Sequence, residues 1–187
     1  EIADHAVSAG CDGIHLRERD APARQVLQHA RTLAEAISGS PASLLINDRV
    51  DIALLAHANG VQLGERSIDV RDARSLTSPG MLIGRSAHDI ATARQATKDG
   101  ADFLLAGHVF ETNSKPGLPG RGLAWLASIC SAVSVPVIAI GGITAERVQP
   151  TIATGAYGIA VGREILLANQ PGDATARLCE ELERARS

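Results

Sequence analysis

The chain has 187 residues, of which 45% are hydrophobic and 21% charged, so it suits one globular domain with a buried core. The net charge of −3 and an aromatic content of 2% argue against nucleic-acid and membrane-surface binding. The three cysteines are widely spaced and no apolar run is long enough to span a bilayer, so we expect a cytoplasmic protein without disulfides or a zinc site.

Short runs of aliphatic residues alternate with longer Ala-rich amphipathic segments. A helical segment at 2–8 opens the chain. Strands are predicted at 13–17, 43–47, 60–64, 82–86, 103–107, 136–142 and 158–162. Helices are predicted at 22–38, 49–57, 70–76, 89–98, 123–132 and 145–153, and a last helix is interrupted near Pro171. Repeated βα units predict a parallel sheet covered by helices.

Glycine-containing phrases introduce several of these strands, as at 9–13, 99–102 and 154–158. They mark turns from helix to strand, which form the end of a barrel opposite to its active site. We therefore predict an α/β fold, a single (β/α)8 TIM-barrel domain over 1–187 whose first strand is missing from this chain. An open doubly wound sheet is the alternative.

Side chains alternate along a strand, and polar or very small residues recur on one side of most predicted strands. This pattern predicts that the barrel interior receives His15, Arg17, Asn47, Gln62, Gly84, Ser86, Leu104, Ala106 and His108.

The segment 107–118 is long, polar and bounded by Gly and Pro, which is typical of a lid over a substrate. It begins with His108, whose imidazole can both accept and donate a proton near neutral pH. We predict that His108 is catalytic; a loop-capping role is the alternative. Thr112, Ser114 and Lys115 would contact substrate.

Two glycine turns follow the last two predicted strands, Gly141-Gly142 and Gly162-Arg163. Backbone N–H groups after the last strands of such barrels commonly bind phosphate. Gly142, Gly162 and Arg163 are therefore predicted to bind phosphate, although two tight turns would have the same pattern.

Six phrases in order along the chain resemble the thiamine phosphate synthase/TenI superfamily. They lie at 15–20, 45–51, 60–64, 84–88, 107–117 and 138–143. The resemblance implies a (β/α)8 barrel, a homodimer and a phosphorylated thiazole as ligand.

This superfamily has two main branches. The synthase couples a pyrimidine diphosphate to a thiazole phosphate and needs Mg²⁺ held by two Asp residues. Asp48 matches the first Asp or caps the helix that follows it, whereas Ser67 stands at the second place, with Glu65 as a displaced substitute. His108 stands where the synthase usually has Pro, which resembles the TenI branch.

On this basis we expect a thiazole tautomerase, an isomerase that uses His108 as its proton shuttle. Arg17 and Arg19 would bind the substrate carboxylate, with Asn47 and Ser86 lining the site. No metal or cofactor is expected for the tautomerase. The first alternative is thiamine phosphate synthase, which would require Mg²⁺. The second alternative is a non-catalytic TenI-like regulatory or ligand-binding protein.

Overall fold

Residues 1–187 are all described by the computed structural model, which contains one parallel sheet in the order β1-β2-β3-β4-β5-β6-β7. The strands are β1 (Gly13–Leu16), β2 (Ser43–Asn47), β3 (Gly60–Leu63), β4 (Leu82–Ala87), β5 (Phe103–Gly107), β6 (Val137–Ile140) and β7 (Gly158–Ala160). The helices are α1 (Ile2–Ser8), α2 (Ala23–Ala36), α3 (Val50–Leu55), α4 (Val70–Leu76), α5 (Ile90–Lys98), α6 (Leu123–Ala132), α7 (Ala145–Ile152), α8 (Arg163–Leu166) and α9 (Pro171–Arg186).

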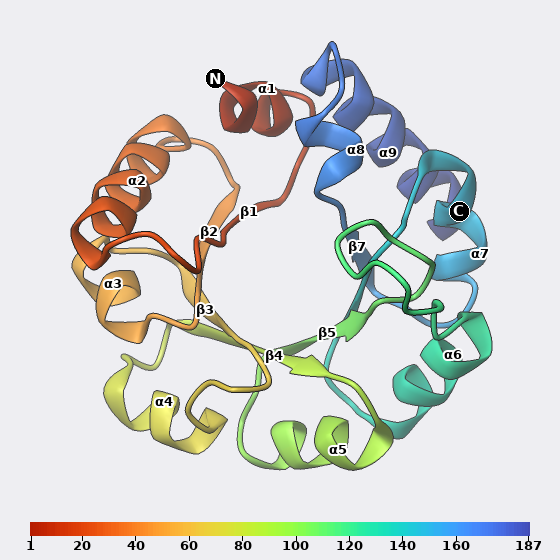
Figure 1. Ribbon diagram of the computed structural model, residues 1–187, viewed down its shortest axis with the longest axis horizontal. Coiled ribbons are helices and arrows are strands. Elements are labelled where there is room, and N and C mark those ends of the chain that lie inside the picture. Colours follow the sequence, from red (N-terminus) through yellow and green to blue (C-terminus); the bar gives the residue numbers. More distant parts are fainter.

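The sheet curls into an incomplete barrel with the helices on its outer side (Figure 1). Every predicted strand is present in the predicted order, which confirms the α/β class with a parallel sheet. Each strand pairs only with its sequence neighbours, so β1 and β7 each keep one unpaired edge. The predicted break in the last helix separates α8 from α9, where Pro171 is the first helical residue.

The outer face of the sheet carries the hydrophobic core. Its fully buried side chains include Ile46, Val61, Ile83, Leu104 and Ala139, which the surrounding helices cover. Burial of such aliphatic side chains supplies most of the stabilising free energy of a domain of this type. None of the helices combines the length and the apolar composition that crossing a membrane requires.

The inner face can be followed from strand to strand through the pairing register. Asn47 pairs with Gln62, Gln62 with Gly84, and Gly84 with Phe103, so these four residues share one face. A Cβ at Gly84 would overlap the Phe103 ring, because that ring lies across the glycine inside the barrel.

This register corrects the prediction for β5. Phe103 and Leu105 face the interior, whereas Leu104 and Ala106 are fully buried beneath the helices. The sequence pattern was misleading there because β5 is apolar on both sides, so alternation alone did not identify its inner side.

Interior glycines are needed where neighbouring strands crowd the barrel axis. A Cβ at Gly60 would lie 2.5 Å from the backbone oxygen of Leu82. We expect Gly60→Ala to lower the free energy of unfolding by about 1–3 kcal/mol, since the backbone has to shift. Chemical denaturation measures this loss. Gly80→Ala is the matched control, because a Cβ there has no neighbour within 4 Å. Equal stability of the two variants would contradict this packing.

Candidate active site

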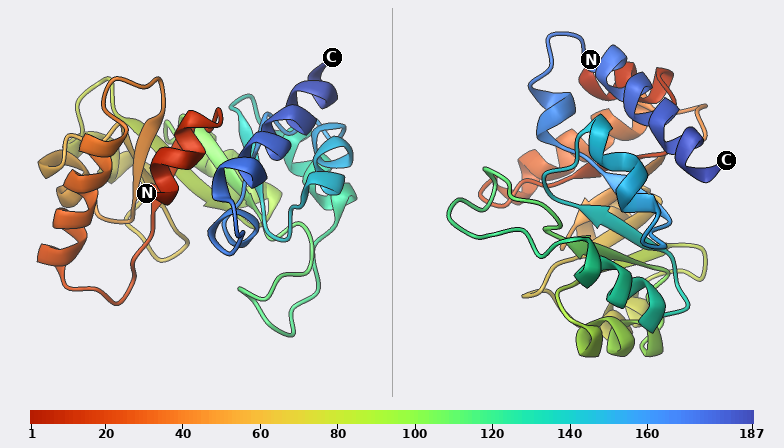
Figure 2. Two further views of the ribbon diagram at one scale, coloured as in Figure 1. Left: turned by 90° about the horizontal axis from the view of Figure 1, so that it is seen from above. Right: turned by 90° about the vertical axis from the view of Figure 1, so that its right-hand side faces the viewer.

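The loops that follow the strands gather at one end of the sheet. The segment after β1 and the longer segment after β5 both project from this end (Figure 2). In parallel βα folds the ligand site lies at the carboxyl ends of the strands, so the candidate site residues should meet at this end.

Arg17 and Arg19 lie in the exposed segment between β1 and α2. Neither guanidinium forms an ion pair or a side-chain hydrogen bond within the chain. Burial, and then the positive charge of Arg19, lowers the pKa of Arg17. Two guanidinium groups close enough to influence each other form a site for an anion with several charged oxygens.

Asp48 directly follows β2 and adopts a left-handed backbone conformation with φ of 59°. Its Oδ1 accepts hydrogen bonds from the Gly64 N–H (2.7 Å) and the Ser67 hydroxyl, and its Oδ2 accepts one from the Asn47 amide (2.8 Å). Burial acts to raise the pKa of Asp48, but the bonds from Ser67, Gly64 and Asn47 lower it overall. The carboxylate is therefore ionised, and α3 begins beyond it at Val50 without a side-chain cap.

Polar residues line the inner face below these charged groups. Gln62 is buried, and its Nε2 donates to the Ser86 hydroxyl (3.3 Å), while its Oε1 has no partner. Asn47 and Ser86 thus lie on the face and at the strand ends where they were predicted. Their contact with a substrate stays a prediction.

His108 follows β5 but does not point an accessible nitrogen into the barrel. The residue is 7% exposed, and its Nε2–H donates to the backbone oxygen of Pro119 (3.1 Å). Its Nδ1 is buried without a partner. The imidazole therefore links the two ends of the loop, which is the capping role given as the alternative. Its action on a substrate stays a prediction.

The rest of this loop is stabilised by its own backbone. The Ser114 N–H donates to the Thr112 hydroxyl (3.3 Å), and the Lys115 N–H donates to the Thr112 carbonyl (3.0 Å). Ser114 and Lys115 are exposed, and the loop projects beyond the strand ends (Figure 2). Thr112, Ser114 and Lys115 thus lie at the carboxyl end of the strands. Their contact with a substrate remains a prediction.

The two glycine turns follow β6 and β7. Gly142 has φ of 66° and packs against the loop, since a Cβ there would overlap the Glu111 carbonyl oxygen. Gly162 precedes α8, and a Cβ there would meet nothing within 4 Å. Arg163 is exposed. The turn at Gly162 is thus open to an anion, whereas one side of Gly142 is covered.

Sequence reasoning missed Arg147, which connects the loop to the first glycine turn. Its Nη1 donates to the Gly142 carbonyl (2.6 Å), and its guanidinium lies 4.7 Å from the centre of the Phe110 ring. The Phe110 N–H also donates to the Gly141 carbonyl (3.0 Å). The available signal was an arginine in the first turn of the helix that follows Gly141-Gly142.

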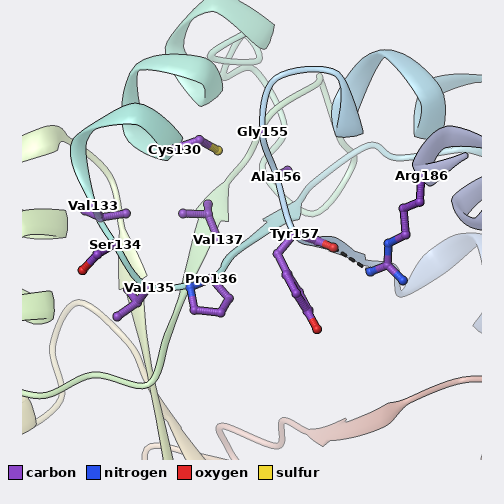
Figure 3. A pocket seen from close by; sticks show the side chains of 10 residues that line it. All are labelled: Cys130, Val133, Ser134, Val135, Pro136, Val137, Gly155, Ala156, Tyr157 and Arg186. Carbon is purple, nitrogen blue, oxygen red and sulfur yellow. Dashed lines mark hydrogen bonds between the residues drawn. The ribbon is translucent and has the colours of Figure 1, made fainter.

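A hollow of about 510 Å³, whose lining residues are drawn in Figure 3, lies at the opposite end of the sheet. It is bordered by Cys130, Val137 and Tyr157, near the amino ends of β6 and β7. Arg186 lines the hollow as well, and its guanidinium donates to the Tyr157 carbonyl (2.6 Å). Because this end carries the helix-to-strand turns, the hollow is not assigned to the active site.

Comparison with known proteins identifies the family. The family model described as thiamine monophosphate synthase matches residues 1–165. The chain belongs to this family. It is 42% identical over 184 residues to a thiamine-phosphate synthase of Gloeobacter violaceus, covering 98% of this chain and 54% of that protein. It is 41% identical over 177 residues to a thiamine-phosphate synthase of Methanoculleus marisnigri, covering 94% of this chain and 82% of that protein.

A solved structure supports the same family membership. Thiamine phosphate pyrophosphorylase from Pyrococcus furiosus matches with a TM-score of 0.92 and 33% identity, over 100% of this chain and 90% of that one. The superfamily resemblance inferred from the six phrases is therefore confirmed.

The expectation of a thiazole tautomerase is wrong. Relatives from 36% to 42% identical over nearly the whole chain are named thiamine-phosphate synthase, which was the first alternative. The error came from interpreting two features as markers of the tautomerase branch, namely His108 and the presence of Ser67 in place of a second Asp. In the structure this histidine stabilises a loop, so its presence says little about which reaction the chain performs.

His15 lies on the inner face close to Arg17, and its Nε2 is buried without a partner. Burial, and then the charge of Arg17, lowers its pKa from 6.5 to about 4. Between pH 4 and pH 6.5 the His15 ring is neutral in the folded protein and protonated in the unfolded chain, so unfolding takes up a proton. We therefore expect the free energy of unfolding to fall by about 1–3 kcal/mol as the pH drops from 6.5 to 4.

Two measurements check this expectation. NMR titration of the His15 ring gives its pKa, and denaturation of the wild type and of His15→Gln over the same pH range gives the stability slope. His15→Gln is expected to have the shallower slope. An ordinary histidine pKa at position 15 would show that the inner face is hydrated.

Proposed function

We propose that this chain is a thiamine-phosphate synthase, a transferase that couples a pyrimidine diphosphate to a thiazole phosphate and releases diphosphate. The observation that carries the proposal is the group formed by Arg17, Arg19 and Asp48 at the carboxyl ends of β1 and β2. The named relatives support the same reaction.

The difficult step is departure of the diphosphate. The carbon–oxygen bond to the pyrimidine breaks, its electron pair leaves with the diphosphate, and the carbon forms its new bond to the thiazole. Negative charge grows on the leaving group during this step. Arg17 and Arg19 have no partner within the chain, so both can donate to diphosphate oxygens without first losing another contact.

The synthase reaction implies Mg²⁺, and the residues around Asp48 fit it. Mg²⁺ in phosphate-handling sites takes one or two carboxylates, with substrate phosphates and water as its other ligands. Asp48 offers an ionised carboxylate whose orientation is held by Gly64, Asn47 and Ser67. When bound, Mg²⁺ adds positive charge that stabilises the departing diphosphate. Ser67 orients Asp48 instead of adding a second carboxylate.

The thiazole phosphate would bind at the glycine turns. We propose that backbone N–H groups near Gly142, Gly162 and Arg163 hold its phosphate, and that Thr112, Ser114 and Lys115 lie over it. Asn47 and Ser86 line the space between the two substrates. The contacts of Arg147 with Phe110 and Gly142 keep the loop base and the first glycine turn together.

The open edges of the sheet support a finer proposal about the fold. β1 and β7 are both unpaired on one side, and the sheet already curls toward closure (Figure 1). One further parallel strand between them, outside residues 1–187, would complete a (β/α)8 barrel. Assembly as a homodimer is part of the same proposal and rests on the family resemblance.

Pyrophosphate release tests the function. Incubation with a pyrimidine diphosphate, thiazole phosphate and Mg²⁺ is expected to yield pyrophosphate and the coupled product. We expect Arg17→Met and Asp48→Asn each to lower kcat/KM for the diphosphate substrate by about 100-fold or more, because each removes stabilisation of the leaving group.

Arg31→Met is the matched control, since it removes the same charge from an exposed position of α2 where the arginine forms no ion pair or side-chain hydrogen bond. Its activity should equal that of the wild type. Absence of pyrophosphate release by the wild type would rule out the synthase reaction. Full activity of Arg17→Met would show that residues other than Arg17 bind the departing diphosphate.

A further inference from the structure

The two candidate diphosphate-binding arginines flank a carboxylate in the sequence, in the order Arg17-Glu18-Arg19. A carboxylate so close to two guanidinium groups is expected to pair with one of them, because opposite charges a few ångströms apart attract strongly near a protein surface. Such a pair would cancel part of the charge that the diphosphate needs. The structure contains no ion pair between Glu18 and either arginine.

Glu18 instead binds a histidine of the following helix. The His29 Nδ1–H, in the middle of α2, donates to Glu18 Oε1 at 2.7 Å. The Glu18 side chain is 31% exposed, and its Oε2 is buried without a partner. The carboxylate is thus turned from the strand ends toward α2, and one hydrogen bond holds it there.

The arginines are correspondingly free. Both side chains are exposed, and the positive charges of Arg17 and Arg19 repel each other. No carboxylate pairs with either guanidinium group to reduce this repulsion. Repulsion between like charges favours the binding of a polyanion, because the anion relieves it. The orientation of Glu18 therefore determines how much positive charge this segment presents.

We propose that His29 is a positioning residue that holds Glu18 away from Arg17 and Arg19 and so keeps both guanidinium groups available for a diphosphate. The identity of this anion rests on the proposed function. The role of His29 rests on the hydrogen bond to Glu18 and on the unpaired arginines.

Inorganic pyrophosphate with Mg²⁺ is the probe, and calorimetry measures its affinity without requiring turnover. Loss of the donor in His29→Leu frees Glu18 to pair with an arginine, so we expect pyrophosphate to bind about three- to tenfold more weakly. His29→Asn keeps a donor near the position of Nδ1 and should bind almost as the wild type does.

The same His29→Leu substitution made in a Glu18→Gln variant shows whether His29 acts by positioning Glu18 or only by stabilising the fold. Glu18→Gln carries no charge that can pair with the arginines, so adding His29→Leu to it should leave pyrophosphate affinity unchanged. A structural defect would weaken binding in both backgrounds. Denaturation midpoints of the four variants show that each is folded under the conditions of the titration.

The outcomes distinguish this proposal from the function on which it rests. Unchanged affinity in His29→Leu, or an equal loss in the Glu18→Gln background, overturns the role of His29 while the synthase proposal stands. A wild type that does not bind pyrophosphate in the presence of Mg²⁺ overturns both.

Discussion

Backbone hydrogen bonding between parallel strands is the constraint on which the rest of this structure depends. Because all seven strands run in the same direction, their carboxyl ends meet at one edge of the sheet. The register then decides which side chains share the inner face, as the row from Asn47 to Phe103 shows. Every residue of the candidate site is carried by that edge or by the segments that leave it.

Charge at this edge is arranged by contacts that are individually small. Asp48 is kept ionised by three donors, and Glu18 is held by His29 away from the neighbouring arginines. The result is one oriented carboxylate beside two unpaired guanidinium groups. Such an arrangement is typical of sites that bind a phosphorylated substrate together with a cation.

Much of the fold was predictable because its signals are local. Alternating aliphatic and amphipathic segments identified the strands and their order, and Pro171 marked the break before α9. The inner side of β5 was not predictable, since its residues are apolar in both directions and only pairing with Gly84 selects Phe103. The hydrogen bond of His108 was not predictable for a related reason, because its acceptor, the carbonyl of Pro119, is brought to the ring by the way the loop folds back.

The amino-acid sequence by itself determined the βα repeat, the superfamily and the set of polar residues at the strand ends, since these follow from periodicity and from short contiguous phrases. Only the tertiary structure decided which of those groups are free to bind a ligand. The Arg17 side chain has no partner within the chain, whereas the His108 ring donates to Pro119. This difference depends on how distant parts of the chain, or the two ends of a loop, come together. Such partners have no fixed spacing, so no local pattern can identify them.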